Sequence, residues 1–239
     1  MWRTDGCDAV SFARLAVIDS RRWISFLLNI LPRLDDVDFA ALSDVEKRML
    51  QMFYITIWGK AVEDWGSEEV QDNLYALSDC TTLLGELISL LQYRFEQIDF
   101  IDEPVDLGFD CPLDLHCTYT RDQLLVAMDF MKPATVREGV KWLPEKQLDV
   151  FFVTLNKADK DYSPTGQRYI HHKERGSKVL LFVREFKSDR VTGGAEAYTY
   201  LGTANYVKHQ GSRPMNITWH LDRPIPAKFL KKTNKLVVG

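Results

Sequence analysis

The first hundred residues carry apolar side chains at helical spacing. In RRWISFLLNIL apolar residues recur every three or four positions, and Pro32 ends the segment. The same spacing recurs in EKRMLQMFYITIWG, in SEEVQDNLYALSD and in CTTLLGELISLLQYRFEQ. Residues that favour a helix start precede these segments: Ser20, Ser43 with Glu46 in a capping box, Ser67, and Asp79 or a following threonine. The pattern predicts a helical bundle whose apolar stripes form a core.

The hydrophobic period changes to two after the segment IDEPVDLGFDCP. This segment combines acids, prolines and a glycine without a helical period, which is typical of a linker. LDLHCTY then alternates as a strand does, and a capping box at Thr120 and Gln123 predicts a short helix through Met128. Five β-branched and aromatic runs follow, separated by turn residues: EGVKWL, DVFFVTLN, SKVLLFVREF, AYTYLGTANYVKH and MNITWHL.

Together these patterns predict an α+β protein with two domains. Residues 1–104 form a helical connector, and residues 105–239 form a β-rich domain, either a barrel or a curved sheet. DVFFVTL and KVLLFV are almost continuously apolar, which predicts central strands. Burial is expected for eight large apolar residues: Trp23, Phe53, Trp58, Leu87, Phe151, Phe152, Leu181 and Phe182.

Charge divides along the same line as the hydrophobic pattern. Residues 1–110 hold 9 Lys and Arg against 21 Asp and Glu, a net charge of −12. Residues 111–239 hold 21 against 13, a net charge of +8. The basic part suits a polyanionic partner, although two halves of opposite charge also neutralise each other across an interface.

Composition indicates a globular protein in a reducing compartment. The chain has 239 residues, of which 46% are hydrophobic, so a core can form without disulfides or metals. The four cysteines show no CxxC pair, which favours a cytoplasmic location. No run approaches the roughly 18 apolar residues of a membrane span, and the first ten residues do not resemble a signal peptide.

Catalytic motifs are mostly missing from the sequence. GxxxxGK[ST], GxGxxG and HExxH do not occur, so no catalytic residue, metal or cofactor is predicted. His116 and Cys117 near Cys111 lack a second ligand pair, and a structural role is expected for them. One alternative stays open, a nuclease metal site made of Asp149, Glu185 and Lys187, because the last two share a strand face.

A basic stretch with interleaved aromatic residues is the stronger signal. Cations bind phosphates and aromatic faces stack on bases, which is the chemistry of a nucleic-acid surface. The predicted phosphate-binding residues are Lys157, Arg168, Lys173, Arg175, Lys178 and, in a GSRP turn, Arg213. A solvated basic loop beside buried strand aromatics would have the same composition, so composition alone leaves both interpretations open.

Long stretches of the chain resemble the C-terminal region of bacterial superfamily-2 helicase–nuclease proteins. These stretches are LDLHCTYTRDQLL, REGVKWLPEKQLDVFFVTLNKADKDYSPT, SPTGQRYIHHKERGSKVLLFVREFK and YVKHQGSRPMNITWHLDRPIPAKF. The resemblance extends from about Ser11 to Phe229, and some members are type IV restriction enzymes directed at modified cytosine. It implies a helical connector and an SRA/PUA-like domain that binds modified DNA in a restriction or phage-defence system. The motor and nuclease motifs of the family lie in regions outside these stretches.

Two functions follow as hypotheses. In the first, residues 105–239 bind double-stranded DNA and hold an extruded modified base in a pocket. The candidate pocket residues are Asp161, which would accept from a cytosine amino group, and Tyr162, Tyr169 and Trp219. In the second, the acidic helical part docks the helicase or nuclease domains of the same system without base recognition. The fused string DYSPTGQRYI is shorter than the family pattern, which puts the base pocket in question.

Overall fold

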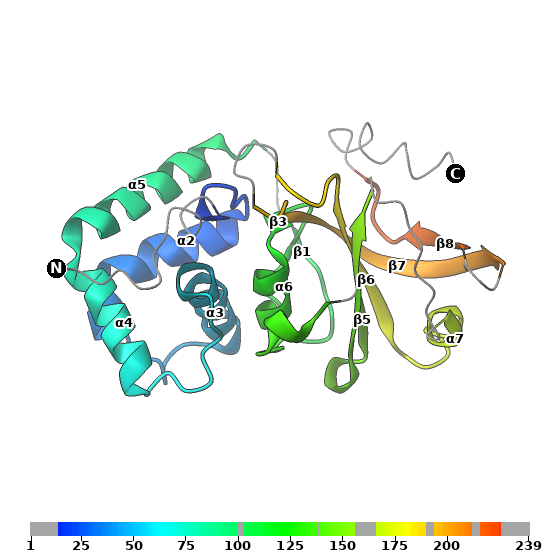
Figure 1. Ribbon diagram of the computed structural model, residues 1–239, viewed down its shortest axis with the longest axis horizontal. Helices are drawn as coiled ribbons and strands as arrows, with labels where there is room; N and C mark the ends of the chain where they lie inside the picture. Colours follow the sequence, from blue (N-terminus) through cyan, green and yellow to red (C-terminus); the bar gives the residue numbers. More distant parts are fainter. Residues whose placement is uncertain are drawn as a thin grey trace. The chain divides into compact units, whose positions relative to one another are not determined.

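The chain folds into two compact units, residues 1–135 and residues 136–239. The computed structural model describes residues 14–99, 103–137, 139–155, 166–189, 194–211 and 216–225 (Figure 1). Helices make up most of the first unit, and a mixed sheet with one short helix makes up the second. The α+β class is therefore confirmed, and the described strands of the second unit form an open sheet rather than a closed barrel.

The helices of the first unit begin close to the residues that the sequence indicates. They are α2 (Arg21–Ile30), η1 (Leu31–Asp36), α3 (Asp44–Trp58), α4 (Glu68–Asp79) and α5 (Thr81–Gln97). The Ser20 side chain accepts a hydrogen bond from the Trp23 amide, and Ser43 and Glu46 form both bonds of the capping box. Ser67 precedes α4 as expected, but its hydroxyl donates to the Asp64 carbonyl instead of capping the helix.

Among the described residues, no single helix is long and apolar enough to cross a membrane. Only α4 and α5 taken together pass that test of length and composition, and they are bent by 84° at the break between them.

The segment after α5 belongs to the helical unit. It contains β1 (Glu103–Pro104), β2 (Asp114–Leu115), β3 (Thr118–Tyr119), α6 (Arg121–Ala127) and η2 (Pro133–Thr135). The expected strand LDLHCTY is thus two short strands, because His116 has a positive φ of 67° that breaks the extended backbone. Helix α6 packs on α3, where Gln123 Nε2 donates to Thr56 Oγ1 at 2.8 Å.

A buried carboxylate ties this segment to α2. Asp114 is only 1% exposed, and its two oxygens bind Arg22 at 2.7 Å and the Ser20 hydroxyl at 2.6 Å. The Tyr119 hydroxyl accepts from the Asp114 amide, and its ring lies 6.1 Å from that of Trp23. These contacts join the segment after α5 to the helices of the first unit, which extends to Thr135.

The sheet of the second unit runs in the order β4–β5–β6–β7–β8. Its strands are β4 (Val140–Leu143), β5 (Leu148–Thr154), β6 (Lys178–Arg184), β7 (Tyr198–Gln210) and β8 (Asn216–Leu221). The five runs predicted as strands therefore all form strands. Strands β5 and β6 are parallel and the other neighbours antiparallel. A parallel pair needs a crossover, and this one contains the short helix α7 (Gly166–Ile170).

The expected core is mostly buried. Trp23, Phe53, Leu87 and Phe182 are 0% exposed and Phe152 is 7% exposed. The other three residues of that expectation are only half-buried: Trp58, Phe151 and Leu181. Trp58 is the last residue of α3, and the other two lie on the sheet face that α7 covers.

The hydrogen bonds and ion pair of the buried Asp114 carboxylate should contribute to the free energy of unfolding of the first unit. We expect Asp114→Ala to lower the free energy of unfolding by about 2–3 kcal/mol, because Arg22 and Ser20 both lose a charged partner. Urea denaturation measures this loss. Lys60→Ala is the matched control: it removes an ion pair with Glu69 that is exposed on both sides, so it should leave the free energy of unfolding almost unchanged. Equal losses in the two variants would contradict the buried network.

Candidate nucleic-acid interface

Strand alternation gives the sheet of the second unit two distinct faces. Cross-strand partners share a face, so Trp142 lies with Asp149, Phe151 with Leu181, and Tyr206 with Trp219. Helix α7 covers these residues, and we call this side the α7 face. The opposite face carries four buried aromatic rings that contact one another in a row, with distances of 4.6–5.9 Å between ring centroids. They belong to Phe152, Phe182, Tyr198 and Tyr200.

A buried ion pair fixes α7 to the sheet. Asp149 is 0% exposed, and its carboxylate accepts three hydrogen bonds of 2.6–3.0 Å from Nε and Nη2 of Arg168. The same guanidinium lies 4.7 Å from the centre of the Trp142 ring. The carboxylate raises the pKa of Arg168 above its ordinary value, so the side chain keeps its charge. A helix of five residues is not stable alone, so this pair determines where α7 lies.

Anchoring α7 completes an aromatic cluster on the α7 face. The rings of Phe151 and Tyr169 are 4.8 Å apart and those of Phe151 and Trp219 are 5.4 Å apart, both edge to face. His172 and Tyr206 lie 6.0 and 6.5 Å from Trp219. Tyr169 is buried, with 6% of its surface exposed, whereas Trp219 is half-buried. Two of the four predicted pocket residues therefore meet here, Tyr169 beneath and Trp219 at the surface.

His172 connects the turn after α7 to strand β7. Its ring is buried, Nδ1 lies 3.1 Å from the Ser177 carbonyl, and Nε2 accepts from the Tyr206 amide at 3.2 Å. A carbonyl oxygen only accepts, so the hydrogen bonds assign the neutral tautomer with the proton on Nδ1. His171 and His172 both lie in the turn that follows α7.

The predicted phosphate-binding residues have different surroundings. Lys173 and Arg175 are exposed in the turn beside His172, and Lys178 is half-buried at the start of β6. Arg168 is engaged by Asp149, which favours an anchoring role over a phosphate contact. The remaining candidates lie outside the described residues: Lys157, Asp161, Tyr162 and Arg213.

The alternative metal site is not assembled in the sheet. Strands β5 and β6 are parallel, with Asp149 opposite Val179 near their start, whereas Glu185 follows Arg184 beyond their end. Six residues along a strand span about 20 Å, which is too far for two ligands of one metal ion. In the part of the chain that the structure describes, no three His, Cys, Asp or Glu side chains are placed to hold a metal.

The cysteines near His116 are in a structural environment. Cys111 and Cys117 are both buried, and Cys117 Sγ donates to the Asp19 carbonyl at 3.5 Å. Burial raises the pKa of the Cys111 thiol to about 12. A thiol with such a pKa stays protonated near neutral pH, which makes it a poor metal ligand and a poor nucleophile.

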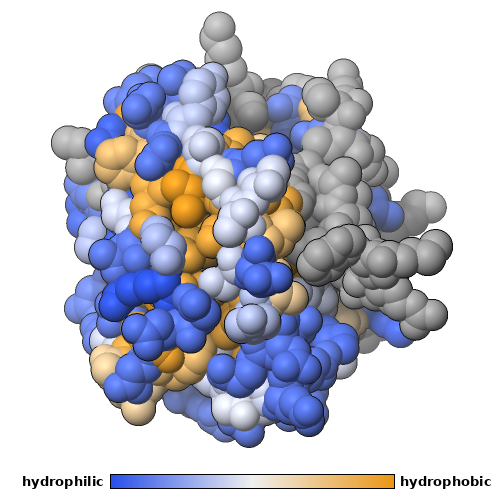
Figure 2. Space-filling model, turned by 90° about the vertical axis from the view of Figure 1, so that its left-hand side faces the viewer, coloured by the Kyte–Doolittle hydropathy of each residue, from blue (hydrophilic) through white to orange (hydrophobic). Residues whose placement is uncertain are grey.

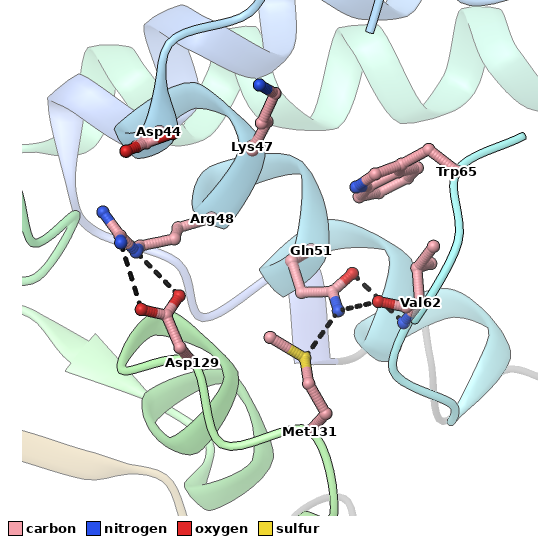
Figure 3. A pocket seen from close by; sticks show the side chains of 8 residues that line it. All are labelled: Asp44, Lys47, Arg48, Gln51, Val62, Trp65, Asp129 and Met131. Carbon is pink, nitrogen blue, oxygen red and sulfur yellow. Dashed lines mark hydrogen bonds and ion pairs between the residues drawn. The ribbon is translucent and has the colours of Figure 1, made fainter. Parts of the chain in front are cut away.

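The helical unit has a hollow of about 330 Å³ that the sequence does not indicate (Figure 3). Its polar groups largely bind one another. Arg48 forms a two-bond ion pair with Asp129, and Gln51 bonds to both backbone groups of Val62 and to the Met131 sulfur. Because these groups are already satisfied, the hollow is explained by packing rather than by a ligand.

Sequence reasoning missed Trp142 and Phe151 as site residues, and it assigned Asp149 and Arg168 to separate roles. The period-two alternation in VKWL and DVFFV was a usable signal, because it places these rings on the same side of their strands as Asp149.

Comparison with known proteins gives one match. Residues 159–232 match a family described as "Domain of unknown function (DUF3427)". The matched part covers less than half of the chain, lies within the second unit, and includes α7, β6, β7 and β8. No curated protein and no solved structure matches the chain.

Removing Arg168 should destabilise the fold rather than weaken a phosphate contact. We expect Arg168→Ala to lower the free energy of unfolding by about 3–5 kcal/mol, because Asp149 is left buried without a cation. Arg168→Lys should recover only part of this, since an ammonium cannot reproduce the two-nitrogen geometry. Denaturant unfolding followed by tryptophan fluorescence measures both.

The exposed neighbour Arg175 is the control for this prediction, and Arg175→Ala should change stability by less than about 0.5 kcal/mol. The double variant Asp149→Leu with Arg168→Met should regain much of the lost stability, because no buried charge remains. An Arg168→Ala protein as stable as the unmodified chain would contradict the anchoring role.

Proposed function

We propose that the second unit binds double-stranded DNA and recognises a modified cytosine. The observation that carries this proposal is the half-buried Trp219, which packs on a layer of aromatic rings near the exposed cations Lys173 and Arg175. The resemblance to restriction helicase–nuclease proteins, with their SRA/PUA-like domains, suggests the modified cytosine as the target. The match to an uncharacterised domain covers this same region of the chain.

Phosphate binding is the part of the proposal that rests on charge. Lys173 and Arg175 project from the turn that His172 holds against β7, so their positions relative to Trp219 are fixed by the fold. The acid between them, Glu174, is paired with His171 at 2.9 Å. Long cationic side chains at an exposed turn reach a nucleic-acid backbone and position the duplex without reading its sequence.

Base recognition is the part that rests on Trp219. Trp219 contacts Phe151 and His172 and is partly exposed, and the exposed part of its ring is the proposed stacking surface. Tyr169 supports the cluster from below and is too buried to be a platform itself. Asp161 and Tyr162 remain candidates for the pocket, from the sequence alone.

A second candidate function concerns the helical unit, which we propose as a docking surface for helicase or nuclease domains. Its exposed large apolar side chains are Val17, Tyr75 and Tyr93, with 41%, 64% and 59% of their surfaces exposed. Figure 2 shows apolar surface between hydrophilic residues on one side of the molecule. Exposed apolar surface rimmed by polar residues is typical of protein interfaces, and a partner with basic residues would complement the acidic composition.

Loss of a phosphate contact should change the salt dependence of DNA binding. We expect Lys173→Ala and Arg175→Ala each to reduce the slope of log K against log salt by about one unit, on modified and unmodified duplexes alike. Titrations at several salt concentrations measure the slope. The control Lys60→Ala, an exposed cation of the helical unit, should leave it unchanged. An unchanged slope in both turn variants would remove these residues from the interface.

Loss of the stacking surface should change the preference between duplexes. We expect Trp219→Leu to remove about 1–3 kcal/mol of preference for a duplex with modified cytosine over a matched unmodified one, and Trp219→Phe to keep part of it. Circular dichroism checks that both variants stay folded. Equal affinity of the unmodified chain for the two duplexes would overturn base recognition. Failure to bind any duplex would overturn DNA binding and leave the docking function.

A further inference from the structure

The outer part of β7 forms a two-stranded ribbon with β8. Strand β6 pairs with β7 as far as Ala204, and beyond it β7 continues with β8, from Asn205 opposite His220 to Gln210 opposite Asn216. Figure 1 shows β7 running past β6 with β8 beside it. Six residues of β7 take part, a length of about 20 Å.

A bulge determines which side chains share a face of the ribbon. Tyr206 is opposite Trp219 but Lys208 is opposite Thr218, so Val207 is an extra residue. Beyond the bulge, His209 joins Tyr206 on the α7 face, and the Tyr206 hydroxyl lies 2.6 Å from His209 Nδ1. Lys208 and Gln210 therefore lie on the opposite face, which we call the outer face.

The outer face is polar, and it is exposed beyond Asn205, which shares the face and is half-buried. Its exposed residues are Lys208, Gln210, Asn216, Thr218 and His220. None of these five side chains is acidic. Amide, ammonium and hydroxyl groups are those that bind base edges, with Asn and Gln suited to adenine and Lys to guanine. The nearest acid along β8 is Asp222, whose carboxylate already binds Thr203 at 2.5 Å and Asn205.

The inner side of the ribbon is held against the body of the unit. Trp219 packs on Phe151 and His172, and His172 also binds the Tyr206 amide. That bond places the turn carrying Lys173 and Arg175 beside the base of the ribbon. The ribbon therefore has one face that packs on the sheet through Trp219 and one polar outer face, with exposed cations near the end where β7 leaves β6.

From this arrangement we infer that the ribbon enters the major groove of double-stranded DNA with its outer face toward the base edges. The major groove is about 12 Å wide and admits a two-stranded ribbon, whereas the minor groove is about half as wide. Lys173 and Arg175 are exposed in the turn that His172 bonds to β7, and Lys208 is exposed on the outer face, so charge complementarity favours a polyanionic duplex as the occupant. The inference rests on the proposed binding of double-stranded DNA by the second unit. Because Trp219 lies on the other face of the ribbon, the inference does not depend on stacking of a base on Trp219.

Thiol crosslinking tests which groove the ribbon occupies. Gln210→Cys and His209→Cys place a thiol on adjacent exposed residues of opposite faces. Each full-length variant is mixed with duplexes that carry a disulfide tether either on cytosine C5, in the major groove, or on guanine N2, in the minor groove. The unmodified chain, with its four native cysteines, defines the background.

We expect Gln210→Cys to crosslink to the major-groove tether, and to stay at background with the minor-groove tether. His209→Cys should stay at background with both. As a second measurement, the double variant Lys208→Ala with Gln210→Ala should weaken duplex binding about tenfold or more. Crosslinking to the minor-groove tether, equal crosslinking of the two faces, or duplex binding without any crosslink would overturn the inference and leave the proposed DNA binding intact. Failure of the unmodified chain to bind any duplex would overturn both.

Discussion

The ion pair between Asp149 and Arg168 is the interaction on which the rest of the candidate site depends. A carboxylate at 0% exposure requires a bound cation, and the cation comes from a helix of only five residues that has no stability of its own. Fixing α7 in this way places Tyr169 on Phe151 and His172 on the Tyr206 amide. The ribbon of β7 and β8 is then supported through Trp219. The buried charge of Asp149 therefore supports the ribbon of β7 and β8, through α7 and the residues that follow it.

Sequence patterns predicted the regular elements because their causes are local. Ser20, Ser43 and Thr120 cap helices where expected, and all five period-two runs form strands. Helix α7 was not predicted, because it is stabilised by the bond of Arg168 to Asp149, which lies 19 residues earlier on strand β5. For the same reason Asp149 was weighed as a metal ligand and Arg168 as a phosphate contact, although they bind each other. The contacts of Asp114 with α2 also join residues that are far apart in the sequence, so local patterns do not indicate them.

The bulge at Val207 shows how one inserted residue changes which side chains act together. Strict alternation along β7 would put Tyr206, Lys208 and Gln210 on one face and His209 on the other. The observed register moves His209 to the face of Tyr206 and Trp219, and leaves Lys208 and Gln210 among the polar residues of β8. The sequence alone does not separate Tyr206 and His209 from Lys208, whereas the sheet places them on an aromatic face and a polar face. Which side chains of β7 and β8 share a face cannot be predicted from the sequence until the register of the two strands is known.

The position of the fused string DYSPTGQRYI can now be related to this anchoring. Its last residues form α7, whose contacts with Asp149, Phe151 and Trp142 come from Arg168 and Tyr169, after Gly166. The helicase–nuclease proteins that the sequence resembles carry a longer segment on the N-terminal side of that point. The entropy of closing a loop grows only slowly with its length, so a longer segment there costs little once α7 is fixed. Variation in loop length is therefore compatible with an unchanged aromatic cluster and ribbon.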